Sequence, residues 1–451
     1  MNKSSEYLIK NASLVNDGEI QECDLLIKNG YIERIDNSIN QDKIQAKIIE
    51  AKGSFVLPGV IDSQVHFREP GLIHKGEIKT ESMAAIAGGV TSYIEQPNTI
   101  PSATTILELE KKYSRASQVS WANYSFNLGA TNDNIDELKR ASKENIAGIK
   151  IFMGSSTGNM LVDNQKSIER IFSEVDHQLI AHCEDEQTIK KNLEELIRRK
   201  GENGLMPSDH PIIRSSEGCY LSSSKAINLA KNTGARFHVY HISSAIELDL
   251  FDGSIPLNEK KITSEACVHH LWFCDEDYKS LGNKIKWNPA VKTDFDRTTL
   301  REGLLDGRID VVSSDHAPHT LEEKMRPYAK APAGGPLIQY SLLAMIEMTK
   351  QNDIDITKVV QLMCHNQADL FRINKRGYLR EGYHADVVIL DPRNSTVVEE
   401  KNILSKCSWS PFENQTFSSN ITHTFVNGVL NYKHGEILGS TNGHRLQFER
   451  K

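Results

Sequence analysis

Side chains that bind metal ions stand at the ends of several short apolar runs in this sequence. Each run has the length and the β-branched content of a buried strand. The side chains at the run ends are His66, His182, His241 and Asp315, and Lys150 lies inside a further run at 148–153. Imidazole nitrogens and carboxylate oxygens that converge on one point suit Zn²⁺ or a similar metal ion. The pattern predicts a metal centre if the fold brings these run ends together.

Each of these residues also has a simpler interpretation. The chain contains 16 histidines, so a single His at a strand end is more often a hydrogen-bonded or surface residue than a ligand. Lys150 on an edge strand would point into solvent. In a buried strand an unpaired ammonium group is costly, which favours a neutral or chemically modified lysine. We interpret His238, His269 and His270 as packing or structural residues.

Eight candidate strands alternate with amphipathic stretches in the middle of the chain. The strands are predicted at 55–62, 90–95, 123–128, 148–153, 178–182, 236–241, 261–266 and 310–314. Between these strands lie stretches, such as 165–175 and 187–199, whose apolar residues recur with the spacing of a helix. The alternation predicts an α/β fold, a TIM (β/α)8 barrel with insertions, whose active site lies at the carboxyl ends of the strands. A doubly wound open sheet is the alternative, but it would normally show an early glycine-rich phosphate loop, and the sequence has none.

The two ends of the chain differ from this middle part because both are rich in short strands and polar turns. Asn29-Gly30 and Asn427-Gly428 each separate two apolar runs, which is a strong hairpin signal. We expect the ends to meet. Residues 1–57 and 379–451 are predicted to form one composite β-sandwich-like domain, and residues 58–378 the metal-dependent barrel.

The composition of the 451 residues fits a globular protein. Hydrophobic residues make up 39% and charged residues 25%, and the net charge of −7 argues against a nucleic-acid or anionic-membrane binder. No apolar run approaches the roughly 18 residues of a membrane span, and the N-terminus lacks the apolar run of a signal peptide. The seven cysteines are odd in number and contain no CxxC pair, which predicts reduced thiols and a cytoplasmic protein.

Several motifs resemble the dihydroorotases of the amidohydrolase superfamily, and the resemblance runs nearly end to end. The most specific segment is Pro-Gly-Val-Ile-Asp at 58–62 followed by His-Phe-Arg-Glu-Pro-Gly at 66–71. The others are Gln-Pro-Asn-Thr at 96–99, Asn288-Pro289 and Asp-His-Ala-Pro-His at 315–319. Hydantoinases and allantoinases are similar in fold and metal ligands, but the Phe-Arg-Glu-Pro-Gly and Pro-Asn-Thr runs point to dihydroorotase.

This resemblance implies an activity and a role for each site residue. The activity is the zinc-dependent, reversible cyclisation of N-carbamoyl-L-aspartate to L-dihydroorotate in pyrimidine (UMP) biosynthesis. Two Zn²⁺ ions are implied, bridged by a CO2-derived carbamate on Lys150, with Asp315 as ligand and proton shuttle. The remaining implied ligands are His66 for the buried zinc and His182 and His241 for the other. The implied substrate contacts are Arg68, Asn98 and His319 for the carboxylate, Asn288 for the ring, and the backbone of Ala333 and Gly334.

One position departs from the family pattern. The family usually has His-x-His after Asp62, and here the first His is replaced by Gln64. An amide oxygen is a weaker zinc ligand than imidazole, so we expect the buried zinc to bind less tightly than is usual. Two alternatives stay open: an allantoinase- or hydantoinase-like enzyme, and a catalytically silent partner of a transcarbamoylase. Assembly as a homodimer is also left open.

Overall fold

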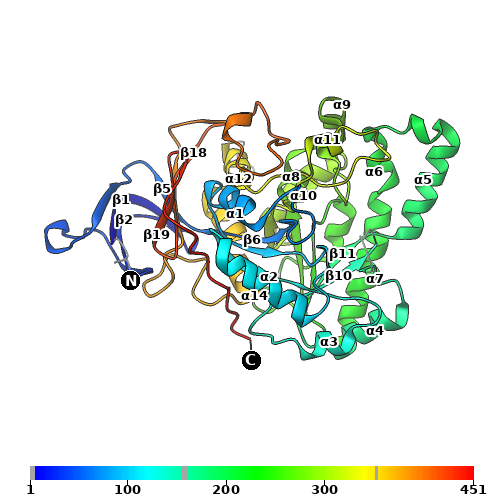
Figure 1. Cartoon of the computed structure of the whole chain (residues 1–451), viewed down its shortest axis with the longest axis horizontal. Coiled ribbons are helices and arrows are strands. Elements are labelled where there is room, and N and C mark those ends of the chain that lie inside the picture. Colours follow the sequence, from blue (N-terminus) through cyan, green and yellow to red (C-terminus); the bar gives the residue numbers. More distant parts are fainter. Residues whose placement is uncertain (1–5, 155–159, 351–353, 451) are drawn as a thin grey trace.

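The computed structural model describes residues 6–154, 160–350 and 354–450. A barrel of parallel strands surrounded by helices makes up its larger part, and a strand-rich part stands beside it (Figure 1). The barrel strands are β6 (Val60–Val65), β7 (Val90–Glu95), β8 (Asn123–Phe126), β9 (Leu128–Gly129), β10 (Ile149–Met153), β11 (Leu179–Cys183), β12 (Phe237–Val239), β13 (Ile262–Cys267) and β14 (Val311–Ser313).

Strand pairing closes the barrel. Strands β6, β7 and β8 pair in parallel, and so do β9 to β14 in sequence order. The segments β8 and β9 form the third strand, interrupted only at Asn127, and a parallel bridge between Val65 and His316 joins the last strand to the first. The barrel therefore has eight strand positions, as the sequence predicts, and the open-sheet alternative is wrong.

Helices connect the strands and cover the barrel from outside (Figure 1). Both faces of each strand are then covered, so the barrel strands are buried almost throughout, although several of them, such as β6 and β13, carry polar residues. The helices are α1 (Ile78–Ala87), α2 (Ile106–Val119), α3 (Ile135–Arg140), α4 (Gln165–Glu174), α5 (Glu186–Lys200), α6 (His210–Ile213), α7 (Ser216–Thr233), α8 (Val268–Trp272), α9 (Tyr278–Leu281), α10 (Asp294–Leu305), α11 (Leu321–Lys324), α12 (Ser341–Lys350), α13 (Ile356–Val360) and α14 (Asn366–Phe371).

The N- and C-terminal segments share one nine-stranded sheet, in the order β20-β19-β18-β15-β5-β1-β2-β3 with β4 paired to β1. Figure 1 shows its N-terminal strands beside its C-terminal ones, at the left. The strands are β1 (Tyr7–Asn16), β2 (Glu19–Lys28), β3 (Tyr31–Asp36), β4 (Lys47–Glu50), β5 (Phe55–Pro58), β15 (Val387–Asp391), β18 (Asn420–Val426), β19 (Val429–Lys433) and β20 (Glu436–Ile437). A separate pair joins β16 (Thr396–Val397) to β17 (Thr416–Phe417).

Both predicted hairpins are present in this sheet. Asn29 and Gly30 have φ of 53° and 87°, and Asn427 and Gly428 have φ of 50° and 74°. Two successive positive φ angles define the turn that matches the twist of the flanking strands. A Cβ on Gly428 would lie 2.7 Å from the Cα of Gly30, so the two turns touch and only glycine fits there.

The predicted strand at 55–62 is wrong as a single element. The structure divides it into β5, which belongs to the nine-stranded sheet, and β6, the first barrel strand. The break falls at Gly59, where a Cβ would lie 2.0 Å from Thr91 Oγ1. The chain therefore crosses from one sheet to the other at a point too crowded for any other residue.

The predicted division into 1–57 with 379–451 and 58–378 stays a prediction, and its residues 1–5 and 451 lie outside the described residues. The last segment, 443–450, runs along the barrel: Tyr124 donates its backbone N–H to His444 O at 2.9 Å, and Arg450 Nη2 donates to Phe371 O at 2.8 Å.

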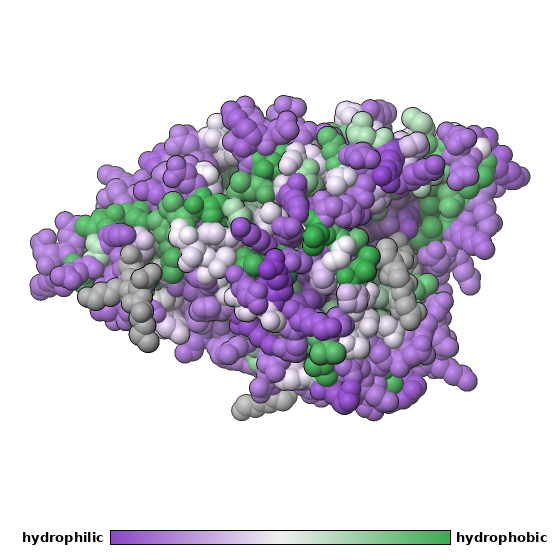
Figure 2. Space-filling view, in the orientation of Figure 1, coloured by the Kyte–Doolittle hydropathy of each residue, from purple (hydrophilic) through white to green (hydrophobic). Residues whose placement is uncertain are grey.

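Polar side chains dominate the face shown in Figure 2, and apolar ones gather over the N-terminal strands at its left. Within the described residues, no helix has the length and apolar character needed to cross a membrane.

Candidate functional site

One cavity of about 510 Å³ at the carboxyl ends of the barrel strands brings together every residue that the sequence predicts for the site. These residues are His66, Arg68, Asn98, Lys150, His182, His241, Asn288, Asp315, His319, Ala333 and Gly334, and Gln64 lines the same cavity. They come from strands and loops spread over more than half of the chain. The structure brings these residues to one cavity, whereas the role of each residue stays a prediction.

Three of these residues hold a strained backbone. Arg68, His241 and Asp315 have φ of 72°, 43° and 47°. A side chain with a Cβ rarely adopts this left-handed region, and such residues persist where the surroundings hold them, often at functional sites. Each lies two or three residues after the end of a barrel strand and lines the cavity.

The first pair of candidate metal-binding residues is His182 and His241. His182 Nδ1 lies 2.9 Å from His241 Nε2, and His182 Nε2 lies 2.8 Å from Glu184 Oε2. Burial alone would raise the pKa of Glu184, but Arg214 and His182 hold it at about 2, so this carboxylate is ionised and accepts the Nε2 proton. The lone pair of His182 Nδ1 is consequently directed toward His241.

The second pair is formed by His66 and Asp315. Asn98 Oδ1 lies 2.8 Å from His66 Nδ1, which assigns the ring proton to Nδ1 and leaves a lone pair on Nε2. That nitrogen faces Asp315 Oδ1 at 3.2 Å. A lone pair and a carboxylate oxygen at this distance need a proton or a cation between them. Burial raises the pKa of Asp315 to about 7, so either occupant is compatible with the site.

Lys150 lines the same cavity as the two pairs. It is 1% exposed on β10, and its Nζ lies 4.2 Å from the Tyr240 ring centroid and 4.9 Å from that of Phe152. This burial excludes the solvent-facing interpretation, and it lowers the pKa of Lys150 to about 7, so near neutral pH part of the amine is in the neutral form that carbamate formation requires. Its charge contributes to the pKa shifts of His66, His182, His241 and Asp315.

These donors fit zinc chemically. Among the described residues, no three His, Cys, Asp or Glu side chains already surround one point. Two imidazole nitrogens that face each other, and a third that faces a carboxylate, nevertheless supply the ligand types that zinc prefers. A carbamate on Lys150 would add two anionic oxygens where the structure places an amine.

Glu184 and Arg214 belong to the site, although the sequence analysis assigned them no role. Glu184 is 2% exposed and pairs with Arg214, which lines a neighbouring cavity that shares Asn288 and Ala333 with the first. A carboxylate on the second nitrogen of a metal-binding His fixes the tautomer and orientation of the ring. The position of Glu184, two residues after His182, was the available signal in the sequence. Nothing local pointed to Arg214.

The other side of the cavity carries cationic groups. Arg68 is 7% exposed; its Nε donates to Pro318 O at 3.0 Å and its Nη2 lies 3.0 Å from His319 Nε2. Lys75, which was not predicted, also lines the cavity. A Cβ on Gly334, at φ 117°, would lie 2.7 Å from Ala317 O, so the loop at 331–334 approaches this wall closely only because it has glycine there.

Gln64 lies inside the cavity but its carbonyl oxygen is engaged elsewhere. The side chain is 2% exposed, and Oε1 accepts a hydrogen bond from Cys267 Sγ at 3.5 Å. Binding a metal through this oxygen would compete with that contact for the lone pairs of the oxygen. The expectation of a weaker buried zinc stays a prediction, with this contact as a further physical reason for it.

The three histidines that the sequence analysis interpreted as structural have packing contacts. His238 Nδ1 lies 2.8 Å from Thr263 Oγ1, and the ring of His269 stacks on Trp287 with centroids 4.5 Å apart. His270 Nε2 lies 3.1 Å from Pro289 O. All three are buried, consistent with the structural interpretation.

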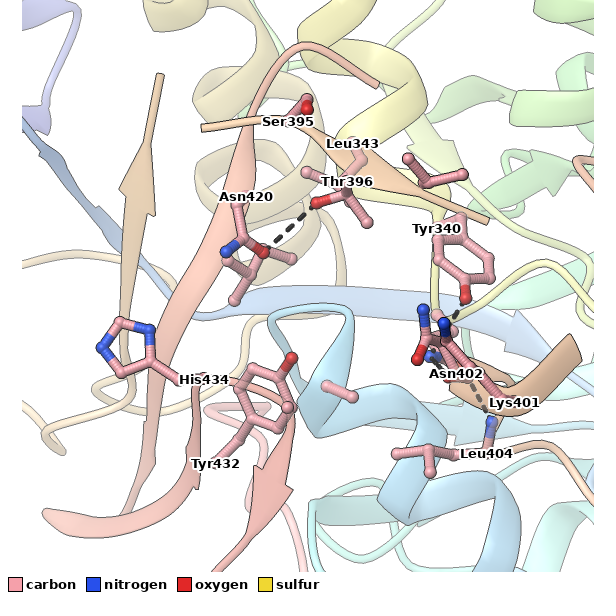
Figure 3. A pocket seen from close by; sticks show the side chains of 15 residues that line it. Tyr340, Leu343, Ser395, Thr396, Lys401, Asn402, Leu404, Asn420, Tyr432 and His434 are labelled. Atoms are coloured by element: carbon pink, nitrogen blue, oxygen red, sulfur yellow. Dashed lines mark hydrogen bonds between the residues drawn. The ribbon is translucent and has the colours of Figure 1, made fainter. Parts of the chain in front are cut away.

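A second cavity, of about 310 Å³, lies where the strand-rich part meets the barrel (Figure 3). Its polar side chains bond to one another and to the backbone: Thr396 Oγ1 lies 3.2 Å from Asn420 Oδ1, and Gln339 Nε2 donates to Asn402 O at 2.7 Å. This cavity contains no group of donors comparable to that of the first, so the first is the candidate site.

Comparison with known proteins agrees with this geometry. The chain matches the model of the amidohydrolase family over residues 55–430. It is 32% identical to a dihydroorotase of Methanosarcina mazei, covering 90% of each chain, and 30% identical to one of Staphylococcus epidermidis, covering 94% of this chain and 98% of that one.

Among solved structures, the L-hydantoinase (dihydropyrimidinase) of Arthrobacter aurescens superimposes with a TM-score of 0.90 at 26% identity, covering 98% of this chain and 99% of that one. The dihydropyrimidinase of Brevibacillus agri, at 21% identity and a TM-score of 0.88, covering 99% and 100%, shares the fold. The barrel, its strand-end cavity and these likenesses together show that the chain belongs to the amidohydrolase family.

Proposed function

We propose that this chain is a dihydroorotase, which catalyses the reversible cyclisation of N-carbamoyl-L-aspartate to L-dihydroorotate in pyrimidine biosynthesis. The observation that carries the proposal is a single cavity with zinc-type donors and a buried Arg68–His319 wall. The substrate needs both, because it carries a cyclic amide to be opened and a carboxylate to be held. Relatives named dihydroorotase, similar over at least nine-tenths of the chain, support the same activity.

The zinc-binding residues are proposed as His182, His241 and the Lys150 carbamate for one ion, and His66, Asp315 and the same carbamate for the other. When bound, zinc lowers the pKa of a water molecule toward about 7 and polarises the amide carbonyl. The membership in the amidohydrolase family supports metal dependence in general. The number of ions and the carbamate belong to the proposal.

Asp315 is proposed to move the proton. Burial raises its pKa to about 7, so near neutral pH it can both take and return a proton. In ring closure Asp315 accepts the proton of the attacking nitrogen and passes it to the oxygen that leaves as water. In ring opening it takes a proton from the attacking water and delivers it to the leaving nitrogen. Arg68 and His319 hold the substrate carboxylate, since a guanidinium fork binds a carboxylate more strongly than a single ammonium does.

The second candidate is a hydantoinase-like activity, favoured by the likeness to the L-hydantoinase structure. Its cyclic amides have no carboxylate beside the ring, so they would leave the buried Arg68 without its anion. The third candidate is a silent partner of a transcarbamoylase. The cavity contains all five predicted metal ligands, and only position 64 departs from the family pattern, which argues against this candidate. The cytoplasmic location fits seven free cysteines, and the homodimer stays a prediction.

The test uses the full chain purified with Zn²⁺ and bicarbonate. Hydrolysis of dihydroorotate is compared with that of dihydrouracil and of hydantoin, which lack the carboxylate. We expect turnover of dihydroorotate alone. Turnover of hydantoin without dihydroorotate would support the second candidate, and zinc-loaded protein that opens none of the three rings would support the third.

A further inference from the structure

His319 stands between two cations in the wall of the cavity. Its Nδ1 lies 3.0 Å from Lys75 Nζ, and its Nε2 lies 3.0 Å from Arg68 Nη2 and 2.9 Å from Ala333 O. Glu323 Oε2 is the nearest carboxylate oxygen to Nδ1, at 3.7 Å, which is too long for a hydrogen bond. The ring therefore has two donor neighbours and one acceptor neighbour within hydrogen-bond distance.

These neighbours decide the tautomer of the ring. A lysine ammonium only donates, so His319 Nδ1 must accept the hydrogen bond from Lys75. A neutral imidazole then carries its proton on Nε2, and this N–H donates to Ala333 O. The opposite tautomer would direct an N–H at Lys75 and leave Ala333 O without this donor.

The chosen tautomer has a consequence for Arg68. Its Nη2 and His319 Nε2 are then both N–H donors, and two donors 3.0 Å apart cannot bond to each other. Both side chains are only 7% exposed. The Nε2–H of His319 already donates to Ala333 O, so the buried Nη2 of Arg68 finds no acceptor on the ring, and an anionic oxygen suits it best.

Lys75 is itself held in place. Its Nζ lies 3.2 Å from Glu323 Oε1, and Glu323 Oε2 accepts the backbone N–H of Thr320 at 3.1 Å in the first turn of α11. The ion pair with Glu323 thus orients Lys75, and Glu323 lies on α11, a helix that carries none of the proposed metal ligands.

We infer that Lys75, oriented by Glu323, is a positioning residue that holds His319 in its Nε2–H tautomer, so that the ring donates to Ala333 O and leaves Arg68 Nη2 free to donate to a carboxylate oxygen of the substrate. The inference rests on the proposed function for the identity of that carboxylate. It adds a specificity-determining residue that touches neither the proposed metal ligands nor the reacting bond.

The test compares Lys75→Met, Lys75→Arg and a matched control, Lys79→Met, whose lysine is exposed on α1. The ¹⁵N chemical shifts of the imidazole, assigned with His319→Gln, report the tautomer in the substrate-free protein. We expect Nε2–H in the native chain, a mixture or Nδ1–H in Lys75→Met, and Nε2–H again in Lys75→Arg and in the control.

Kinetics supply the second readout. The loss of a well-oriented charged hydrogen bond predicts a KM for dihydroorotate about tenfold higher in Lys75→Met, with kcat little changed. Lys75→Arg should recover most of the native KM. An Nε2–H signal that persists in Lys75→Met, or an unchanged KM, would overturn the inference.

The test still gives an answer in two further cases. If Lys75→Met does not fold, Glu323→Gln carries the same comparison, because it releases Lys75 without removing it. If the native chain fails to act on dihydroorotate, the proposed function fails, while the tautomer measured without substrate still decides whether Lys75 sets His319.

Discussion

Glu184→Gln tests whether the carboxylate behind His182 governs metal affinity. The native contact is a charged hydrogen bond of 2.8 Å between two buried groups, because the pKa of Glu184 is held at about 2. A hydrogen bond to a charged group contributes about 1.5–3 kcal/mol and a neutral one about 1 kcal/mol. The amide keeps an acceptor oxygen but loses the charge, so about 1.4 kcal/mol, or tenfold in zinc affinity, should be lost.

The assay is competition for Zn²⁺ against a chromogenic chelator, with bound zinc counted by mass spectrometry. Glu184→Ala removes the acceptor as well and should weaken zinc about 100-fold. Glu194→Gln is the matched control, since Glu194 is an exposed residue of α5 paired only loosely with Lys190. Native zinc affinity in both Glu184 variants, with an intact thermal unfolding transition, would refute the role assigned to this carboxylate.

The other predictions concern the proposed ligands and the carboxylate wall. Lys150→Ala should lose zinc and turnover, with partial recovery in short carboxylic acids; native zinc content and activity would contradict the carbamate. Asp315→Asn should fold normally and lose roughly 10²–10⁴-fold in kcat, and a variant that keeps most of the native turnover would argue against proton transfer by this residue. Arg68→Lys should raise KM, and Arg68→Met should cost on the order of 2–5 kcal/mol in kcat/KM; unchanged kinetics in both would favour the hydantoinase-like candidate. Gln64→His should slow the stripping of zinc by chelator, and an unchanged stripping rate would show that position 64 does not reach the metal.

The sequence determined the barrel and the membership of the site, because both depend on patterns along the chain. Apolar runs alternating with amphipathic stretches predict parallel strands with helical crossovers, and parallel strands bring their carboxyl ends to one face. His182 and His241 could therefore be placed together without knowing any contact between them. The role proposed for Arg68 came from the family resemblance of the motif at 66–71, since neither its charge nor its spacing identifies a substrate-binding residue.

Tertiary structure alone decided the contacts between segments far apart in the chain. The split of 55–62 follows from the pairing of β5 with β1 and β15 and of β6 with β7, and periodicity within one strand carries no record of its neighbours. Lys75 and His319 are 244 residues apart, yet they lie 3.0 Å from each other. Such a pair forms only when two loops adopt particular conformations over the same strand ends. The local sequence pattern determines which elements form, whereas the packing among the elements determines which side chains meet. The tautomer of His319 depends on this packing.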